Sequence, residues 1–159
     1  MVVDMRKMNR EQRIAAGAII MQEEKILLVR YKRSAQESYL VGPGGGVDSD
    51  DESITQALMR EVKEETGLQV NPYRLLFVED LLSSRYRMVK FWFLCSIADG
   101  QVEKTQGAID EGIVEVSWFG RDELINEVVY PPILMSANWR SFLGDNQESK
   151  YLELRNADF

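Results

Sequence analysis

Short apolar stretches, separated by turns rich in glycine, proline and acidic residues, run along most of the chain. Stretches of this length that are rich in Val, Ile, Phe and Trp predict β-strands. The first two candidates form a hairpin across the polar residues 22–24, and the third runs into a glycine-rich turn. The pattern predicts strands over 14–21, 25–31, 38–41, 73–82, 87–97 and 113–119, with the glycine turn at 42–46.

A helical pattern replaces the strand pattern between Ser53 and Thr66. Ser and Asp side chains at 49–51 offer oxygen atoms for its N-cap, and Gly67 is typical of the residue that ends a helix. A second helix is predicted over 122–129, with Asp122 as its cap. Pro131 and Pro132 favour a third, since proline suits the first helical turn.

This order of elements predicts the α/β class, with a mixed β-sheet sandwiched between helices. A chain of 159 residues fits one compact domain, so we expect a single domain over 1–159. Residues 148–159 are polar and predict no defined element, and we interpret them as a C-terminal tail.

Composition narrows the possible functions. The chain has no histidine, which excludes His metal sites and imidazole catalysis. Its formal net charge of −7 disfavours nucleic-acid binding, which usually needs a basic surface. No apolar run approaches the roughly 20 residues that a membrane span requires. The single cysteine, Cys95, cannot form an intramolecular disulfide, so we expect a cytoplasmic protein.

Three glutamates gather on one side of the helix predicted at 53–66. At about 100° per residue, with Glu61 at zero, Glu64 falls at about 300° and Glu65 at about 40°. They continue the apolar stripe of the first half of the helix, made by Ile54, Ala57 and Leu58. Carboxylates on a buried stripe repel one another and lose hydration, and a divalent cation offsets both costs.

An acidic helix taken alone is most often a solvated face, but the neighbouring residues follow a longer pattern. Gly46 is followed after five residues by Glu52, and after seven more by the run from Arg60 to Leu68, which reads Arg-Glu-Val-Lys-Glu-Glu-Thr-Gly-Leu. All nine constrained positions of the Nudix box are matched between Gly46 and Leu68, so the chain resembles the Nudix hydrolase family. One departure is the loop before Glu52, which is one residue longer than in many members.

The resemblance implies a Nudix fold and a Mg²⁺-dependent hydrolase, with Mn²⁺ as a possible substitute. The expected reaction cleaves a diphosphate bond in a nucleoside diphosphate linked to another group: a nucleotide sugar, ADP-ribose, a dinucleoside polyphosphate or a nucleoside triphosphate. The alternative is a non-catalytic Nudix-fold sensor of a nucleotide metabolite. A small nucleotide-like molecule is the expected partner in either case, and a homodimer is possible because family members are often dimers.

The resemblance also assigns roles to individual residues. Glu61, Glu64 and Glu65 are expected to bind metal, with Glu61 also acting as base and Glu64 contributing to catalysis. Arg60 is expected to orient Glu61 through a charge-assisted hydrogen bond. The backbone carbonyl of Gly45 is a further expected ligand.

One more acidic ligand is expected from a later loop. Asp110, Glu111 and Glu115 are candidates, and Glu111 is preferred because glycines flank its turn; a plain surface acid is the alternative. Arg30 and Tyr86 are the expected substrate contacts. Arg30 lies with two other cations at the end of a strand, where plain exposure is the competing interpretation.

Overall fold

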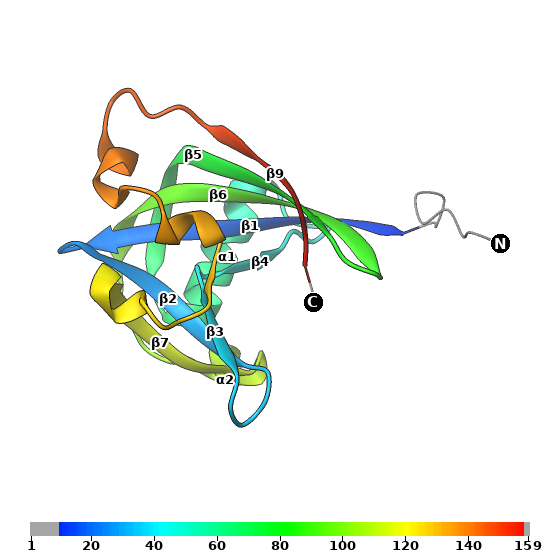
Figure 1. Ribbon diagram of the computed structural model, residues 1–159, viewed down its shortest axis with the longest axis horizontal. Coiled ribbons are helices and arrows are strands. Elements are labelled where there is room, and N and C mark those ends of the chain that lie inside the picture. The colour runs from blue at the N-terminus through cyan, green and yellow to red at the C-terminus, as the bar shows by residue number, and fades with distance from the viewer. Residues whose placement is uncertain (1–9, 158–159) are drawn as a thin grey trace.

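Nine strands join in one mixed sheet in the computed structural model, which describes residues 10–157 (Figure 1). The strands are β1 (Glu11–Gln22), β2 (Lys25–Lys32), β3 (Ser38–Val41), β4 (Gly44–Gly46), β5 (Gln69–Leu82), β6 (Tyr86–Asp99), β7 (Ile113–Gly120), β8 (Val129–Tyr130) and β9 (Lys150–Asn156). The helices are α1 (Ile54–Thr66) and α2 (Gln106–Asp110), with 3-10 turns η2 (Arg121–Leu124), η3 (Pro132–Met135) and η4 (Trp139–Leu143).

The long strand β1 is the branch point of the sheet. It pairs in parallel with β6 and antiparallel with β4, while its last residues pair antiparallel with β2. The strand order is β8-β3-β2-β1-β6-β5-β9, with β4 added on β1 and β7 on β2. The segments β8 and β9 therefore form the two ends of this path.

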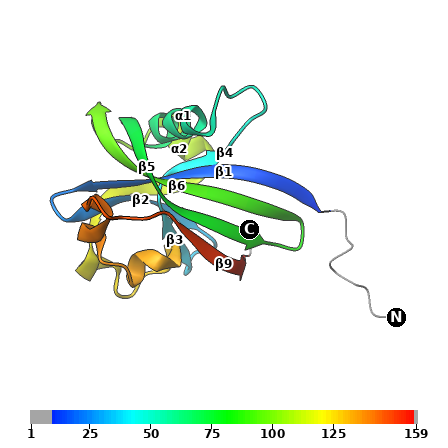
Figure 2. The ribbon, with the colours of Figure 1, turned by 90° about the horizontal axis from the view of Figure 1, so that it is seen from above.

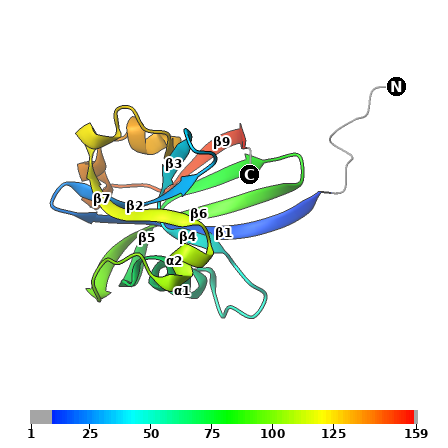
Figure 3. The ribbon, with the colours of Figure 1, turned by 90° about the horizontal axis from the view of Figure 1, so that it is seen from below.

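Two apolar cores lie on opposite sides of the sheet. One, beneath α1, includes Ala18, Leu58 and Val62, all fully buried. The other contains Trp92 and Phe142 and is covered by the 3-10 turns. Figures 2 and 3 show α1 and α2 on one side and the η3–η4 region on the other. The prediction of an α/β fold with a mixed sheet between helical layers is confirmed.

The predicted strands and the central helix are present with small changes in their bounds. Helix α1 begins one residue late because Ser53, not residues 49–51, is its N-cap: the Ser53 side chain accepts a hydrogen bond from the Gln56 amide. Gly67 ends the helix in the left-handed conformation, with φ 79°, as predicted.

The prediction of a helix over 122–129 is wrong. Only the 3-10 turn η2 forms there, with Asp122 inside it and Gly120 in the cap position. Residues beyond the turn instead pair with β3, where the Leu40 amide donates to the Val128 carbonyl at 2.8 Å and Leu40 lies opposite Val129. Sheet pairing overrides local helical preference here.

The polar segment 148–159 contains a strand, β9, that the sequence did not predict as one. It adds in parallel to β5 at the sheet edge, and most of its side chains are exposed. An edge strand whose two faces are both largely exposed to solvent lacks the alternation of apolar and polar residues that marks a strand in sequence. Within the described residues, the structure contains no helix with the length and apolar character needed to cross a membrane.

Candidate metal centre and substrate pocket

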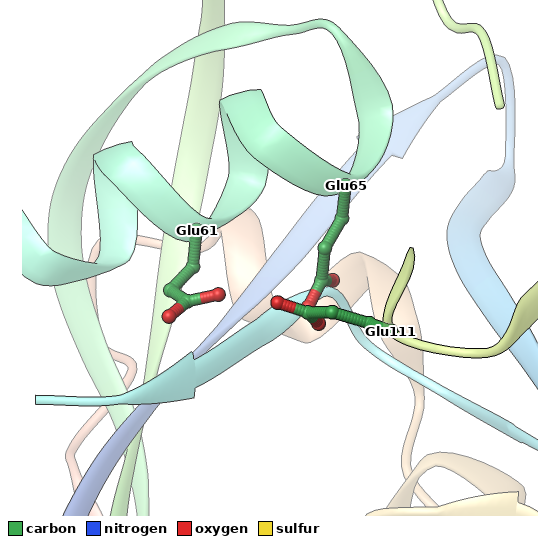
Figure 4. A group of neighbouring side chains, drawn as sticks. All are labelled: Glu61, Glu65 and Glu111. Atoms are coloured by element: carbon green, nitrogen blue, oxygen red, sulfur yellow. The ribbon is translucent and has the colours of Figure 1, made fainter. Parts of the chain in front are cut away.

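Helix α1 places two of the predicted glutamates inside the protein. Glu61 is 8% exposed and Glu65 1% exposed, and both leave the same side of the helix (Figure 4). They share this side with buried Ala57, Leu58 and Val62. Packing of α1 on the sheet therefore fixes both carboxyl groups against β4, with Glu65 at the Gly44 amide and Glu61 at Gly45.

A third carboxylate comes from a distant part of the chain. Glu111 follows the short helix α2, which Thr105 caps by accepting from the Ala108 amide. Figure 4 shows Glu111 reaching the Glu65 carboxyl group from a separate segment. One oxygen from each of Glu61, Glu65 and Glu111 lies within 4.8 Å of the other two. The structure thus brings Glu111 to two glutamates that lie about 50 residues earlier in the sequence.

The electrostatics of this group are unfavourable without a counter-charge. Burial, with Glu111 adding to it, raises the pKa of Glu65 to about 9. Burial also raises the pKa of Glu61, although the Arg60 hydrogen bond opposes the change. One Glu65 oxygen accepts from the Gly44 amide at 3.2 Å, whereas Oε1 is buried with no hydrogen-bond partner.

These observations fit a divalent cation. Hard cations such as Mg²⁺ prefer carboxylate oxygens, and a buried oxygen without a donor is available as a ligand. Oxygens within 4.8 Å of each other can reach one ion. The donor set of Glu61, Glu65 and Glu111 is therefore suitable for the metal that the sequence implies.

Arg60 lies beside the acidic group rather than within it. Its guanidinium donates to Glu61 Oε1 at 3.0 Å and to both oxygens of Asp51 at 3.0 and 3.2 Å. Asp51 is in the loop before α1, so Arg60 connects this loop to Glu61. The contact with Glu61 has the geometry that the sequence implied.

Glu64 is placed differently from its two neighbours. Its side chain is 48% exposed, and its nearest charged partner is Arg60, 3.5 Å away. The buried arc of α1 runs from Ala57 to Thr66, at about 320° to 140° on the projection, and Glu64 at about 300° falls outside it. The structure does not bring its carboxylate into the group of three.

A pocket of about 730 Å³ opens next to the carboxylates. Glu65 and the glycines 44–46 line one part of it. An aromatic wall continues from there: Tyr31 and Tyr39 stack with ring centroids 5.4 Å apart, and Tyr130 meets Tyr39 edge-on at 5.6 Å. The volume and the aromatic lining suit a nucleotide-sized ligand.

Basic side chains also line this pocket: Lys32, Arg33, Lys90 and Arg155. Arg33 lies over the Tyr39 ring at 4.9 Å, and Lys90 lies over the Trp92 ring at 4.3 Å. Burial in the wall lowers the pKa of Lys90. An acidic protein therefore carries local positive charge where an anionic substrate would enter.

Sequence reasoning missed Lys90 and its cross-strand neighbour Glu79. Glu79 is 3% exposed, and its two oxygens accept from the Trp92 indole at 2.7 Å and from Arg155 at 3.0 Å. The signal was present, since both charged residues interrupt strongly apolar strands. A charge at an inward-facing strand position indicates a pocket or a buried network.

Arg30 and Tyr86, the expected substrate contacts, lie elsewhere. Arg30 donates to both oxygens of Glu127 at 2.8 and 2.9 Å and to Glu115 at 2.6 Å. Tyr86 is 8% exposed, with the Arg13 guanidinium 3.9 Å from its ring centroid. Neither is among the residues that line the pocket.

Cys95 is a buried residue of β6. Burial raises the pKa of its thiol to about 12. It therefore stays protonated at neutral pH, which makes it a packing residue rather than a nucleophile.

Comparison with known proteins connects this arrangement to a family. Residues 11–136 match the NUDIX domain family. The chain is 36% identical over 103 residues to the human 8-oxo-dGDP phosphatase NUDT18, covering 65% of this chain and 30% of that protein. It is 40% identical over 55 residues to an ADP-ribose pyrophosphatase of Methanocaldococcus jannaschii, covering 35% of this chain and 32% of that one.

The fold has solved counterparts. A UDP-X diphosphatase structure superposes with a TM-score of 0.66 at 28% identity, covering 90% of this chain and 68% of that one. Matched segments span about a third of the length of the curated relatives, so the likeness concerns the domain. Because the family match covers most of the chain and the fold agrees with it, the chain belongs to the Nudix family.

Proposed function

We propose that this protein is a Mg²⁺-dependent hydrolase, with Mn²⁺ as a substitute, that cleaves the diphosphate bond of a nucleoside diphosphate linked to another group. The observation that carries the proposal is the meeting of three carboxylates at the rim of an aromatic, basic pocket. The carboxylates suit a cation, and the pocket suits a nucleotide. Their adjacency supports a pose in which the phosphate chain lies between the two.

Glu61, Glu65 and Glu111 would hold the metal. The metal, when bound, supplies positive charge to the phosphoryl oxygens and lowers the pKa of a water molecule. The Gly45 carbonyl is a further proposed ligand, because Gly45 packs against the Glu61 carboxyl group.

The chain's own residues position the base and bind the phosphates. Arg60 holds Glu61 in place, and Glu61, whose pKa burial raises, accepts a proton as the base. Glu64 adds negative charge beside Arg60 and retains its proposed part in catalysis. Lys32 and Arg33 lie at the pocket where they can meet phosphate oxygens.

The names of the relatives support the substrate class without selecting one member. They are an 8-oxo-dGDP phosphatase, an ADP-ribose pyrophosphatase and a UDP-X diphosphatase. All three names describe a nucleoside diphosphate or a derivative of one. We extend that shared class, and no single substrate, to this chain.

The test is release of phosphorylated products from nucleotide sugars, ADP-ribose, dinucleoside polyphosphates and nucleoside di- and triphosphates, with and without Mg²⁺. We expect metal-dependent turnover of at least one. Glu65→Gln and Glu111→Gln should each lower kcat by roughly 10²-fold or more. Asp110→Asn is the matched control, because Asp110 adjoins Glu111 but accepts its hydrogen bond from Gln106. Metal-independent turnover, or full activity in both glutamine variants, overturns the proposal.

A non-catalytic sensor would bind nucleotides and metal in this assay without releasing product. A single domain over 1–159, cytoplasmic location and homodimer formation stay predictions from the sequence.

A further inference from the structure

The two ends of the sheet meet across the pocket. Arg155, on the last strand of the order, lies over the ring of Tyr130, on the first, with its guanidinium carbon 5.0 Å from the ring centroid. The same guanidinium donates to Glu79 Oε2 at 3.0 Å. Arg155 lies beyond the segment 11–136 that matches the family, yet it lines the pocket. A part of the chain outside the family domain therefore completes the pocket wall that contains Tyr130, Lys90 and Arg155.

The wall offers hydrogen-bond donors more readily than acceptors. Lys90 has three N–H donors, and no described carboxylate forms an ion pair with it. Arg155 lies beside it with a side chain 31% exposed. The one carboxylate here, Glu79, is 3% exposed, and both of its oxygens already accept a bond. A ligand atom entering this wall meets the N–H donors of Lys90 and Arg155 first.

The surroundings favour a ring rather than a second phosphate at this wall. Apart from the amide of Asn156, the rest of the lining from β5, β6, β8 and residues 155–157 is apolar or aromatic: Leu81, Met88, Trp92, Tyr130 and Ala157. Trp92 lies flat in a slot where a Cβ on Gly17 or Gly42 would come within 2.3 or 2.5 Å of its ring. A hydrated phosphate loses water against such a surface, whereas a planar base buries its faces and presents its edge atoms to the donors.

We propose that Arg155 and Lys90 make the pocket selective for keto nucleobases, guanine and uracil, over amino nucleobases, adenine and cytosine. This rests on the proposed function for the nucleotide itself. Guanine and uracil carry a carbonyl oxygen where adenine and cytosine carry an NH₂ group. The carbonyl accepts from the ammonium or guanidinium, while the NH₂ group faces donors and remains unpaired.

The test uses the nucleoside monophosphates GMP, UMP, AMP and CMP as probes, so that it does not depend on turnover. Their binding is measured by calorimetry in the presence of Mg²⁺. An unpaired polar group in a partly buried site corresponds to about tenfold in affinity or more. We expect GMP and UMP to bind at least about tenfold more tightly than AMP and CMP.

Three variants locate the preference. Lys90→Met should remove it, and so should Arg155→Met. Because Arg155→Met leaves Glu79 buried beside one remaining donor, the double change Glu79→Gln with Arg155→Met is made as well, so that loss of folding cannot imitate loss of selectivity. Lys150→Met is the control: this exposed cation is on the same strand but not in the pocket lining. Mn²⁺ binding, measured without nucleotide, should be unchanged in all of them.

The outcomes separate the two proposals. Equal affinity for all four probes, or a preference that survives both Lys90→Met and the double change, overturns the selectivity and leaves the hydrolase proposal standing. Keto selectivity without turnover in the substrate panel overturns the hydrolase and keeps the selectivity. Binding of none of the four overturns the selectivity, while turnover of the substrate panel decides the hydrolase proposal separately.

Discussion

Gly45 packs directly on the carboxyl group of Glu61. A Cβ built on Gly45 would lie 2.6 Å from Glu61 Cδ and within 2.8 Å of both carboxylate oxygens. The next residue, Gly46, has open space at the same position, with no atom within 4 Å. Neither glycine has a positive φ, so the backbone conformation at both positions is one that alanine adopts without strain. Only the contact with Glu61 distinguishes the two substitutions. These two adjacent glycines provide a matched pair of substitutions.

Gly45→Ala should therefore displace Glu61 and weaken metal binding by about 10- to 100-fold, the range found when the support of a metal ligand is lost. Gly46→Ala should leave the metal affinity within about twofold. Titration of each variant with Mn²⁺, followed by electron paramagnetic resonance, measures both. Equal losses in the two variants would show that the loop, rather than the contact with Glu61, determines the affinity.

Glu65→Gln should stabilise the metal-free protein while removing activity. The carboxyl group is 1% exposed, and one of its oxygens has no donor. An amide of the same shape is neutral without taking up a proton on folding, so the free energy of unfolding in EDTA at neutral pH should rise by roughly 1–3 kcal/mol. Mg²⁺ should raise the melting temperature of the wild type but barely that of the variant. A variant less stable than the wild type in EDTA would contradict this account.

The stability of the metal-free protein should fall with rising pH because of the same residue. The pKa of Glu65 is about 9 in the folded protein, against an ordinary value of 4.5. The folded state thus holds this proton more tightly than the unfolded chain. The resulting stability is full below about pH 4.5 and is lost as pH rises through about 9, at up to about 1.4 kcal/mol per pH unit.

Urea unfolding in EDTA between pH 5 and 9 measures this decline. The comparison that isolates Glu65 is the difference between the wild type and Glu65→Gln at each pH, since other groups titrate equally in both. That difference should widen steadily toward pH 9. A constant difference across the range would mean that Glu65 is ionised throughout.

The local parts of this site were predictable from sequence because they depend on helical geometry. Residues 53–67 contain the N-cap of α1, the glycine that ends it and its apolar periodicity. Together these features put Glu61 and Glu65 on one buried side of the helix. The projection erred at Glu64, since the centre of the buried arc is set by packing on the sheet. Glu111 was identifiable as a candidate by its neighbouring glycines, but its meeting with α1 depends on tertiary structure.

The pocket was not predictable in the same way. Antiparallel pairing of β5 and β6 sets Glu79 opposite Lys90, and the parallel pairing of β9 at the sheet edge adds Arg155 to the same wall. No local pattern in the polar segment 148–159 specifies that pairing. The pairing of Arg30 was not predictable for the same reason: the sequence shows a cation at a strand end, but not its contact with Glu127, which comes 97 residues later.

Substitutions of Arg30 and Arg33 should distinguish an effect on stability from an effect on substrate binding. The Arg30 side chain is 16% exposed and holds Glu127 and Glu115, so Arg30→Met should lower the free energy of unfolding by about 1–3 kcal/mol. Arg33 is exposed, covers Tyr39 and lines the pocket. Arg33→Met should instead raise KM several-fold for the nucleotide that the panel identifies, with little change in stability.

Urea unfolding and steady-state kinetics on both variants make the comparison, and Arg30→Met combined with Glu127→Leu tests the cause. If the isolated Glu127 carboxylate is what destabilises Arg30→Met, replacing it by an apolar residue should recover part of the loss, because Glu127 is the more buried of the two carboxylates that lose their cation. Restored stability with an unchanged KM assigns Arg30 to the framework. A KM that rises in Arg30→Met as much as in Arg33→Met would return Arg30 to the substrate site, and would require the Glu127 ion pair to open when the nucleotide binds.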